Sequence, residues 1–173
     1  MNRIFLISTF CLIGALLTGC SLTNSVPETP LTFSLPSTPI VQQIVYVPYL
    51  VTASASTSDS TPTNVMDGDF ESIWNAGAGP EQWIQIDMGS PLALRAIRLV
   101  VSQYPEGETV HQIWVGADAA SMFQVHEFAG FTRDSDVLEF ITDGPMDNIR
   151  FIKIVTTQST SWVAWREIEV IGE

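Results

Sequence analysis

The stretch EQWIQIDMGSPLALRAIRL, residues 81–99, contains two apolar segments that are separated by the turn signal GSP. In the second segment Ile97 and Leu99, followed by Val101, recur at every second position and so share one face of an extended chain. Neither segment carries the apolar period of about 3.6 residues that is typical of an amphipathic helix. This stretch therefore predicts two consecutive β-strands.

The rest of the chain from residue 51 onward has the same character. Its segments are rich in β-branched and aromatic residues and are separated by turn signals such as PEGE, DGP and QSTS. Only TPTNVMDG, residues 61–68, has the pattern of a short helical turn. Strands are expected at residues 83–88, 94–104, 109–117, 122–131, 137–141, 149–157 and 162–172. Their number and spacing predict an all-β fold, a two-sheet β-sandwich or jelly roll.

Residues 20–49 differ in composition from the strand-rich region. Prolines recur there among serines and threonines, at positions 27, 30, 36, 39 and 48. Because repeated prolines block helices and interior strands, this segment is predicted to be an extended, semi-rigid tether. The part at residues 40–50, IVQQIVYVPYL, is too apolar for a linker alone and is interpreted as a leading strand that packs on the domain. The folded domain is assigned to residues 50–173.

Residues 1–19 are interpreted as a secretory signal peptide. Arg3 precedes an uncharged apolar run, IFLISTFCLIGALL, at residues 4–17. As a helix this run would be about 21 Å long, shorter than the ~30 Å hydrocarbon layer of a membrane. The following LLTGC resembles the lipobox of bacterial lipoproteins, which implies cleavage before Cys20 and acylation of its thiol. The alternative is an ordinary signal peptide that is cleaved at a nearby small residue.

Lipidation would place the protein at the cell membrane, facing the extracytoplasmic side. Cys11 lies within the signal peptide, so Cys20 would be the only remaining cysteine and no intrachain disulfide is expected. The fold must then be held by core packing or by a metal ion. With 7 basic and 19 acidic residues, the net charge of −12 argues against nucleic acid or an anionic lipid surface as a partner. Membrane contact is therefore expected only through the lipid anchor.

Three motifs stand in a fixed order along the domain. They are NVMDGDFESIW at residues 64–74, EQWIQIDMGSPLALRAIRL at 81–99 and WVAWREIEVIG at 162–172. Together they resemble the discoidin, or coagulation-factor C-type, domain of the galactose-binding-like jelly-roll class. The resemblance spans roughly residues 51–172, and it implies a β-sandwich that serves as a binding module. Many animal members join the two ends of the domain by a disulfide, which this chain cannot form.

The resemblance also implies a structural Ca²⁺ ion where the first motif meets the last strand. The implied ligands are the backbone carbonyls of Asn64, Asp69 and Arg166, the carboxylates of Asp67 and Glu167, and an oxygen of Ser72. Ca²⁺ takes about six to eight hard oxygen ligands in flexible geometry, which suits such a set. In the alternative interpretation Asp67 only caps or turns the chain, and Glu167 pairs with Arg95, Arg98 or Arg150.

In lectin-like members of this fold, loops at one end of the sandwich form the binding face. Aromatic rings lie there under the C–H faces of sugars, and amides or charged groups bind the hydroxyls. Candidates for this role are Trp162, which follows TTQSTS, Tyr104, which lies beside PEGE, and Asn75, which begins NAGAGPEQ. The alternative is that these are ordinary loop residues.

The other tryptophans are interpreted differently. Trp74, Trp83 and Trp165 lie within or beside strand motifs and are assigned to the core, because buried aromatic side chains dominate sandwich cores. Trp114 is left open, since alternation places it on the face opposite Ile113.

No catalytic motif is recognisable. His111 and His126 are the only histidines and lie within predicted strands, and the chain has no nucleophile elbow, HExxH or phosphate-binding glycine loop. The sequence therefore predicts a non-enzymatic, lipid-anchored binding module for carbohydrate, stiffened by Ca²⁺. A protein-interaction or envelope-structural lipoprotein without a sugar ligand is the alternative. Phospholipid binding is disfavoured by the excess of acidic residues.

Overall fold

The computed structural model describes residues 44–173 of the 173-residue chain. The signal peptide at residues 1–19, the acylated Cys20 and the tether up to residue 43 are predictions that lie outside these residues. Within the described region, no helix has both the length and the apolar character that crossing a membrane requires.

Strands make up nearly all the regular structure, and every pairing between them is antiparallel. The elements are β1 (Ile44–Val45), β2 (Leu50–Ala53), η1 (Pro62–Met66), β3 (Trp74–Asn75), β4 (Gln82–Val101), β5 (Gly107–Gly116), β6 (Phe123–Thr132), β7 (Val137–Gln158) and β8 (Ala164–Gly172). The all-β prediction is confirmed, and the one short helix, η1, coincides with the predicted helical turn.

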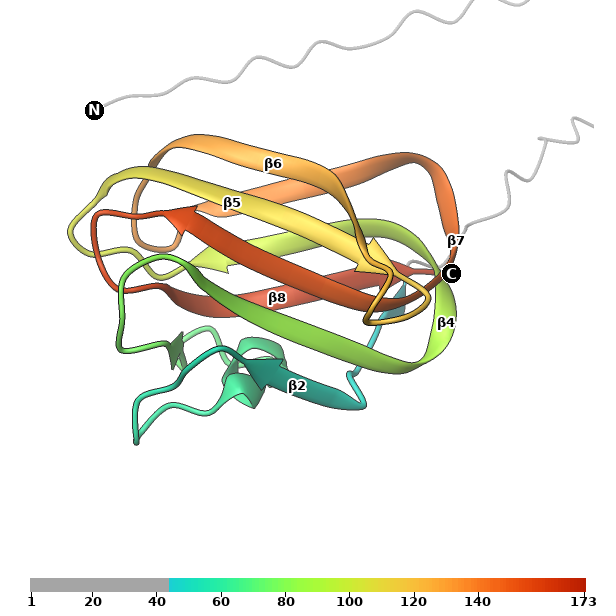
Figure 1. The fold of residues 1–173 in the computed structure, drawn as a ribbon, viewed down its shortest axis with the longest axis horizontal. Helices are drawn as coiled ribbons and strands as arrows, with labels where there is room; N and C mark the ends of the chain where they lie inside the picture. The colour runs from blue at the N-terminus through green and yellow to red at the C-terminus, as the bar shows by residue number, and fades with distance from the viewer. Residues whose placement is uncertain (1–43) are drawn as a thin grey trace, which may run out of the picture. The chain divides into compact units, whose positions relative to one another are not determined.

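Two long strands, β4 and β7, pass from one sheet of the sandwich to the other (Figure 1). Residues 82–87 of β4 pair with residues 151–156 of β7, and residues 84–87 also pair with β2. This first sheet continues from β7 through β5 to β6. Residues 96–100 of β4 pair instead with β8 and with residues 137–141 of β7, in a second sheet that β1 and β3 extend. The two sheets of the sandwich are thus continuous with each other through β4 and β7.

The segment that predicted two strands forms a single bent strand. The register of β4 against β7 is irregular between Asp87 and Ala96, and Gly89 at this bend has a φ of +78°. Glycine adopts such a φ readily, which allows the strand to bend at Gly89. The GSP signal therefore marks a bend within one strand and not a reversal of the chain. The predicted strands at 137–141 and 149–157 likewise belong to one element, β7.

The inward-facing residues of the two sheets form the core. From the first sheet come Ile84, Ile86, Ile113, Ile152 and Ile154, and from the second come Ile97, Leu99, Ile168 and Val170, all fully buried. The apolar segment before the domain contributes as its composition suggests. Ile44 and Val45 pair with Gly172 and Ile171 of β8, and Tyr46 packs against the core.

Two of the three tryptophans that the sequence analysis assigned to the core are buried in it. Trp74 and Trp165 lie opposite each other on β3 and β8 and are almost inaccessible to solvent. The assignment of Trp83 is wrong, because Ile84 and Ile86 face the core and alternation turns Trp83 to the outer face of the first sheet. There it is half-buried, with Nζ of Lys153 4.5 Å from the centroid of its ring.

Candidate functional site

Loops that join β3 to β4, β4 to β5, and β7 to β8 enclose a hollow of about 780 Å³, here called the rim hollow. Asn75, Tyr104 and Trp162, the three residues that the sequence analysis assigned to a ligand, all line it. They are distant in sequence and come together because these three loops meet at one end of the sandwich. None of the residues that line the rim hollow is an acid, a lysine, an arginine or a histidine.

The two aromatic side chains of the rim hollow are unusually open to solvent. Tyr104 is 90% exposed and Trp162 is 57% exposed, whereas Trp74 and Trp165 are buried. Oδ1 of Asn75 accepts a hydrogen bond from the backbone N–H of Gly77 at 2.8 Å, which orients the amide. The rim hollow thus combines exposed aromatic rings with an oriented polar group.

One residue that sequence reasoning missed holds two rim loops together. Gln103 is buried, and its Nε2 donates hydrogen bonds to the carbonyl oxygen of Pro105 and to Oγ1 of Thr160, both at 2.9 Å. Its Oε1 accepts a hydrogen bond from Oγ of Ser159 at 3.1 Å. The loops also approach closely at Gly107, where a Cβ atom would lie 2.5 Å from Cγ2 of Thr160. Hydrogen bonds from the Gln103 side chain and close packing at Gly107 therefore both fix the shape of the rim hollow.

A second candidate region is the acidic loop, residues 67–72, together with Asn64 and Glu167. Oγ of Ser72 lies 2.9 Å from Oδ2 of Asp67 and 3.1 Å from the carbonyl oxygen of Asn64. Oδ1 of Asp67 accepts the N–H of Asp69, and the carbonyl of Asp69 accepts the N–H of Ser72. The loop therefore gathers several of the implied calcium ligands, and Asp67 also stabilises the turn, as the alternative interpretation expected.

Glu167 reaches this loop from β8. The residue is buried, with a relative exposure of 5%, and its Oε2 has no hydrogen-bond partner among the described residues. Asp67 and Glu167 line the same cavity of about 250 Å³. Burial and, to a smaller degree, the negative charge of Asp67 raise the pKa of Glu167 to about 7, although a hydrogen bond from the backbone of Gly68 acts in the opposite direction.

The alternative partner for Glu167 is not observed. The three arginines proposed for it pair elsewhere: Arg95 with Glu173, Arg98 with Glu139 and Glu169, and Arg150 with Asp87. That ion-pair prediction is wrong, because those arginines lie along the strands beside other carboxylates. Glu167 is left as a buried carboxylate without a cation among the described residues.

The family model of the F5/8 type C domain, another name for the discoidin domain, matches residues 51–168. The chain belongs to this family. This domain type is a non-catalytic binding module, which is consistent with the prediction of no enzymatic activity. Among curated proteins, none matches the chain in sequence.

Solved structures support the jelly-roll assignment of this F5/8 type C domain. The family 32 carbohydrate-binding module of AlyQ in complex with 4,5-unsaturated mannuronic acid is 24% identical, with a TM-score of 0.60 over 73% of this chain and 97% of that one. The family 32 module from C. perfringens NanJ in complex with galactose is 16% identical, with a TM-score of 0.64 over 75% and 99%. A pectin-binding module is 23% identical, with a TM-score of 0.61 over 72% and 91%. At these identities the likeness shows the fold.

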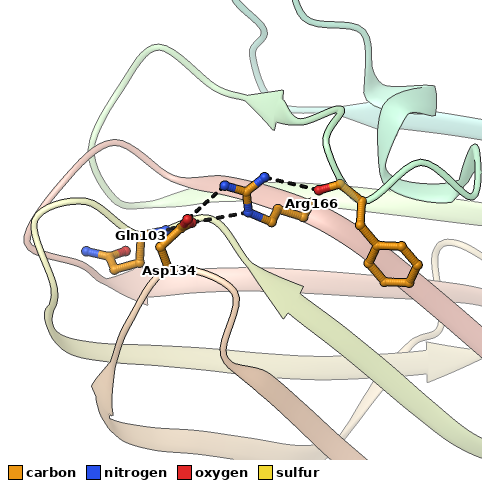
Figure 2. Close-up of polar contacts among 4 residues, drawn as sticks. Gln103, Asp134 and Arg166 are labelled. Atoms are coloured by element: carbon orange, nitrogen blue, oxygen red, sulfur yellow. Dashed lines mark hydrogen bonds and ion pairs between the residues drawn. The ribbon is translucent and has the colours of Figure 1, made fainter.

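In this F5/8 type C domain the side chain of Arg166 links the acidic loop to the rim hollow (Figure 2). Its Nη1 donates to the carbonyl oxygen of Phe70 at 3.0 Å, and its Nη2 donates to Oδ2 of Asp134 at 2.7 Å. Oδ1 of Asp134 accepts the backbone N–H of Gln103 at 3.3 Å. The hydrogen bond from Arg166 lowers the pKa of Asp134. The resemblance implied a role only for the carbonyl of Arg166, so this side-chain link was missed.

Proposed function

We propose that this domain is a non-catalytic carbohydrate-binding module whose ligand occupies the rim hollow. The observation that carries the proposal is the meeting of Tyr104 and Trp162, both largely exposed, with Asn75 in one hollow of about 780 Å³. A protein that exposes large aromatic side chains in a concave site gains free energy when a ligand covers them. The sugar complexes of the AlyQ and NanJ modules support the class of ligand.

The chemistry of the lining favours an uncharged part of a saccharide. The C–H face of a sugar ring packs on the indole of Trp162, and the amide of Asn75 and hydroxyls such as that of Ser161 bind the sugar hydroxyls. Neither an ammonium nor a carboxylate lies in the lining to select a charged group. The hollow is open and a single site of this kind binds weakly, so many copies on one surface would supply avidity.

Attachment to the cell membrane through an acylated Cys20 would provide such a display, facing the extracytoplasmic side. The support for this part is the LLTGC motif after an apolar run. Mass spectrometry of the mature N-terminus tests it, since a free thiol at Cys20 or a different cleavage site would contradict lipidation.

We also propose that Ca²⁺ binds at the acidic loop in a structural role. The oxygens available are those of Asn64, Asp67, Asp69, Ser72, Arg166 and Glu167. The fit rests on the unpartnered, buried Oε2 of Glu167 beside Asp67, and on the closeness of Asp67, Ser72 and the Asn64 carbonyl. Within residues 44–173 no three Asp, Glu, His or Cys side chains are arranged so that they alone could hold a metal ion, so backbone and hydroxyl oxygens would have to complete the set. The bound ion would neutralise the carboxylates and fix the loop against β8.

A glycan array, followed by calorimetry on the sugars that it selects, tests the binding function. Trp162→Ala should weaken binding about tenfold or more, because it removes one of the two exposed aromatic side chains of the hollow. Phe131→Ala is the matched control, since Phe131 is 49% exposed on β6 and does not line the rim hollow. A blank array together with capture of a defined envelope protein would instead favour the protein-interaction alternative.

A further inference from the structure

A second hollow, of about 460 Å³, lies on the outer face of the first sheet and is here called the sheet-face hollow. The strand register places Gln85 of β4, Lys153 of β7 and Trp114 of β5 side by side, and all three line it. Met122, from the turn between β5 and β6, forms another part of the wall. The hollow is thus built on three paired strands rather than on loops, which gives it a rigid floor.

Lys153 is the only lysine in the chain, and its pairing is unlike that of the other cations. Each of the five arginines within residues 44–173 forms an ion pair with a carboxylate. Lys153 has no such partner there, although the chain contains 19 acidic residues. Its Nζ lies 4.5 Å from the ring centroid of Trp83. Among residues 44–173, the ammonium group of Lys153, a residue that lines this hollow, therefore contacts an aromatic ring and pairs with no carboxylate.

The aromatic wall beside Lys153 is held in a fixed orientation. Nε1 of Trp114 donates to Oε1 of Gln112 at 3.2 Å, and Nε2 of Gln112 donates to Oε2 of Glu127 at 2.9 Å. An indole oriented in this way loses little freedom when a ring packs on it. Glu81 is the only carboxylate in the lining; it is exposed, and no ion pair joins it to Lys153.

We propose that the sheet-face hollow is a second saccharide-binding site, and that it takes a sugar which carries a carboxylate, a uronate residue of an acidic oligosaccharide. Nζ of Lys153 donates charge-assisted hydrogen bonds to the sugar carboxylate, and the sugar ring packs against Trp114. Gln85 offers an amide to the hydroxyls. The rim hollow has no cation in its lining, so the two sites select different sugars. This inference does not depend on the proposed function of the rim hollow.

The single lysine makes the experiment direct. Reductive ¹³C-methylation of the purified protein keeps the charge of Lys153 and gives one dimethyl-lysine resonance, separate from that of the terminal amine. The labelled protein is titrated with trigalacturonate and, in parallel, with its methyl ester, which has the same rings without the charges. We expect a saturable shift of the Lys153 resonance with trigalacturonate, and at least tenfold weaker binding of the ester.

Variants of the unmodified protein, measured by calorimetry with trigalacturonate, separate the two hollows. Lys153→Gln should weaken binding about tenfold and Trp114→Ala should abolish it, whereas Trp162→Ala should leave it unchanged. Circular dichroism checks that each variant is folded, and Lys153→Gln changes only a half-buried surface side chain. Three results would overturn the proposal: no shift with either sugar at millimolar concentration, equal binding of acid and ester, or loss of trigalacturonate binding in Trp162→Ala but not in Trp114→Ala.

Discussion

Two regions of the described chain each bury a side-chain atom that has no hydrogen-bond partner, and their surroundings differ. In the core, Nε2 of His111 is unpartnered; Nδ1 lies 3.0 Å from Oγ1 of Thr156, and the ring packs edge-on against Trp165 at 4.6 Å between centroids. At the acidic loop, Oε2 of Glu167 is unpartnered, and Asp67 lines the same cavity. The first atom has only apolar and hydroxyl groups beside it, whereas two further acids, Asp67 and Glu169, line the cavity at the second.

This difference separates a structural residue from a candidate ligand. Burial lowers the pKa of His111 to about 4, so the ring is neutral at physiological pH and leaves no charge to compensate. The remaining cost is one unmade hydrogen bond, about 1–3 kcal/mol. Glu167 shares its cavity with a second acid, and a cation would relieve the repulsion between them. An unpartnered buried atom therefore points to a bound ion only where like charges surround it.

The largest expected effect is the response of stability to calcium. If Ca²⁺ binds only the folded protein, the free energy of unfolding should rise by about 4 kcal/mol at a free concentration 1,000 times the dissociation constant. Glu167→Gln should lose most of this gain, because it removes a buried carboxylate from the loop. Chemical denaturation with calcium and with a chelator measures the difference.

The matched control for this measurement is Glu169→Gln. Glu169 lines the same cavity but is already paired with Arg98 at 2.6 Å, so its loss should leave the calcium response intact. Identical wild-type denaturation curves with calcium and with chelator would mean that no calcium binds at the acidic loop. The proposed difference between Glu167 and His111 would then be wrong.

A somewhat smaller effect is expected at His111, in the dependence of stability on pH. Below its ordinary pKa of 6.5 the unfolded chain binds a proton at His111, whereas the folded chain does not until about pH 4. Stability should therefore rise with pH between 4 and 6.5, by about 3 kcal/mol for this group. The difference in unfolding free energy between the wild type and His111→Leu, measured across this range, isolates the contribution of His111. A difference that does not change with pH would mean that the histidine is not buried as a neutral ring.

The sequence predicts the parts of this molecule that depend on local patterns. Alternation locates the strands, and the three rim residues are found because each stands in or beside a polar loop at the end of a strand. The same alternation, applied strictly, would have turned Trp83 outward, because its neighbour Ile84 faces the core. That error came from assigning tryptophans to the core by residue type.

Other features depend on pairings that no local pattern contains. Gln103 and Thr160 are 57 positions apart, and their hydrogen bond follows from the way two loops meet at one end of the sandwich. The sheet-face hollow likewise depends on register, which sets Lys153 between Gln85 and Trp114. A shift of one residue in either ladder would turn Lys153 toward the core. The bend in β4 belongs to the same class, since the signal GSP is as compatible with a chain reversal as with a kink.

The smallest expected effect tests whether the acidic loop and the rim hollow are connected through Arg166. Arg166→Met keeps the apolar stem and the main-chain carbonyl but removes the donors to Phe70 and Asp134. The ion pair with Asp134 is partly exposed, so the free energy of unfolding should fall by about 1 kcal/mol or less. Because Asp134 also accepts the backbone N–H of Gln103, the rim loops should loosen, and the affinity for a sugar selected by the array should fall about threefold, or about 0.7 kcal/mol.

Arg95→Met is the control: its pair with Glu173 is also partly exposed, but neither residue lines the rim hollow or the cavity at the acidic loop. Equal sugar affinity in both variants and the wild type would mean that the two regions act separately, each held by its own contacts.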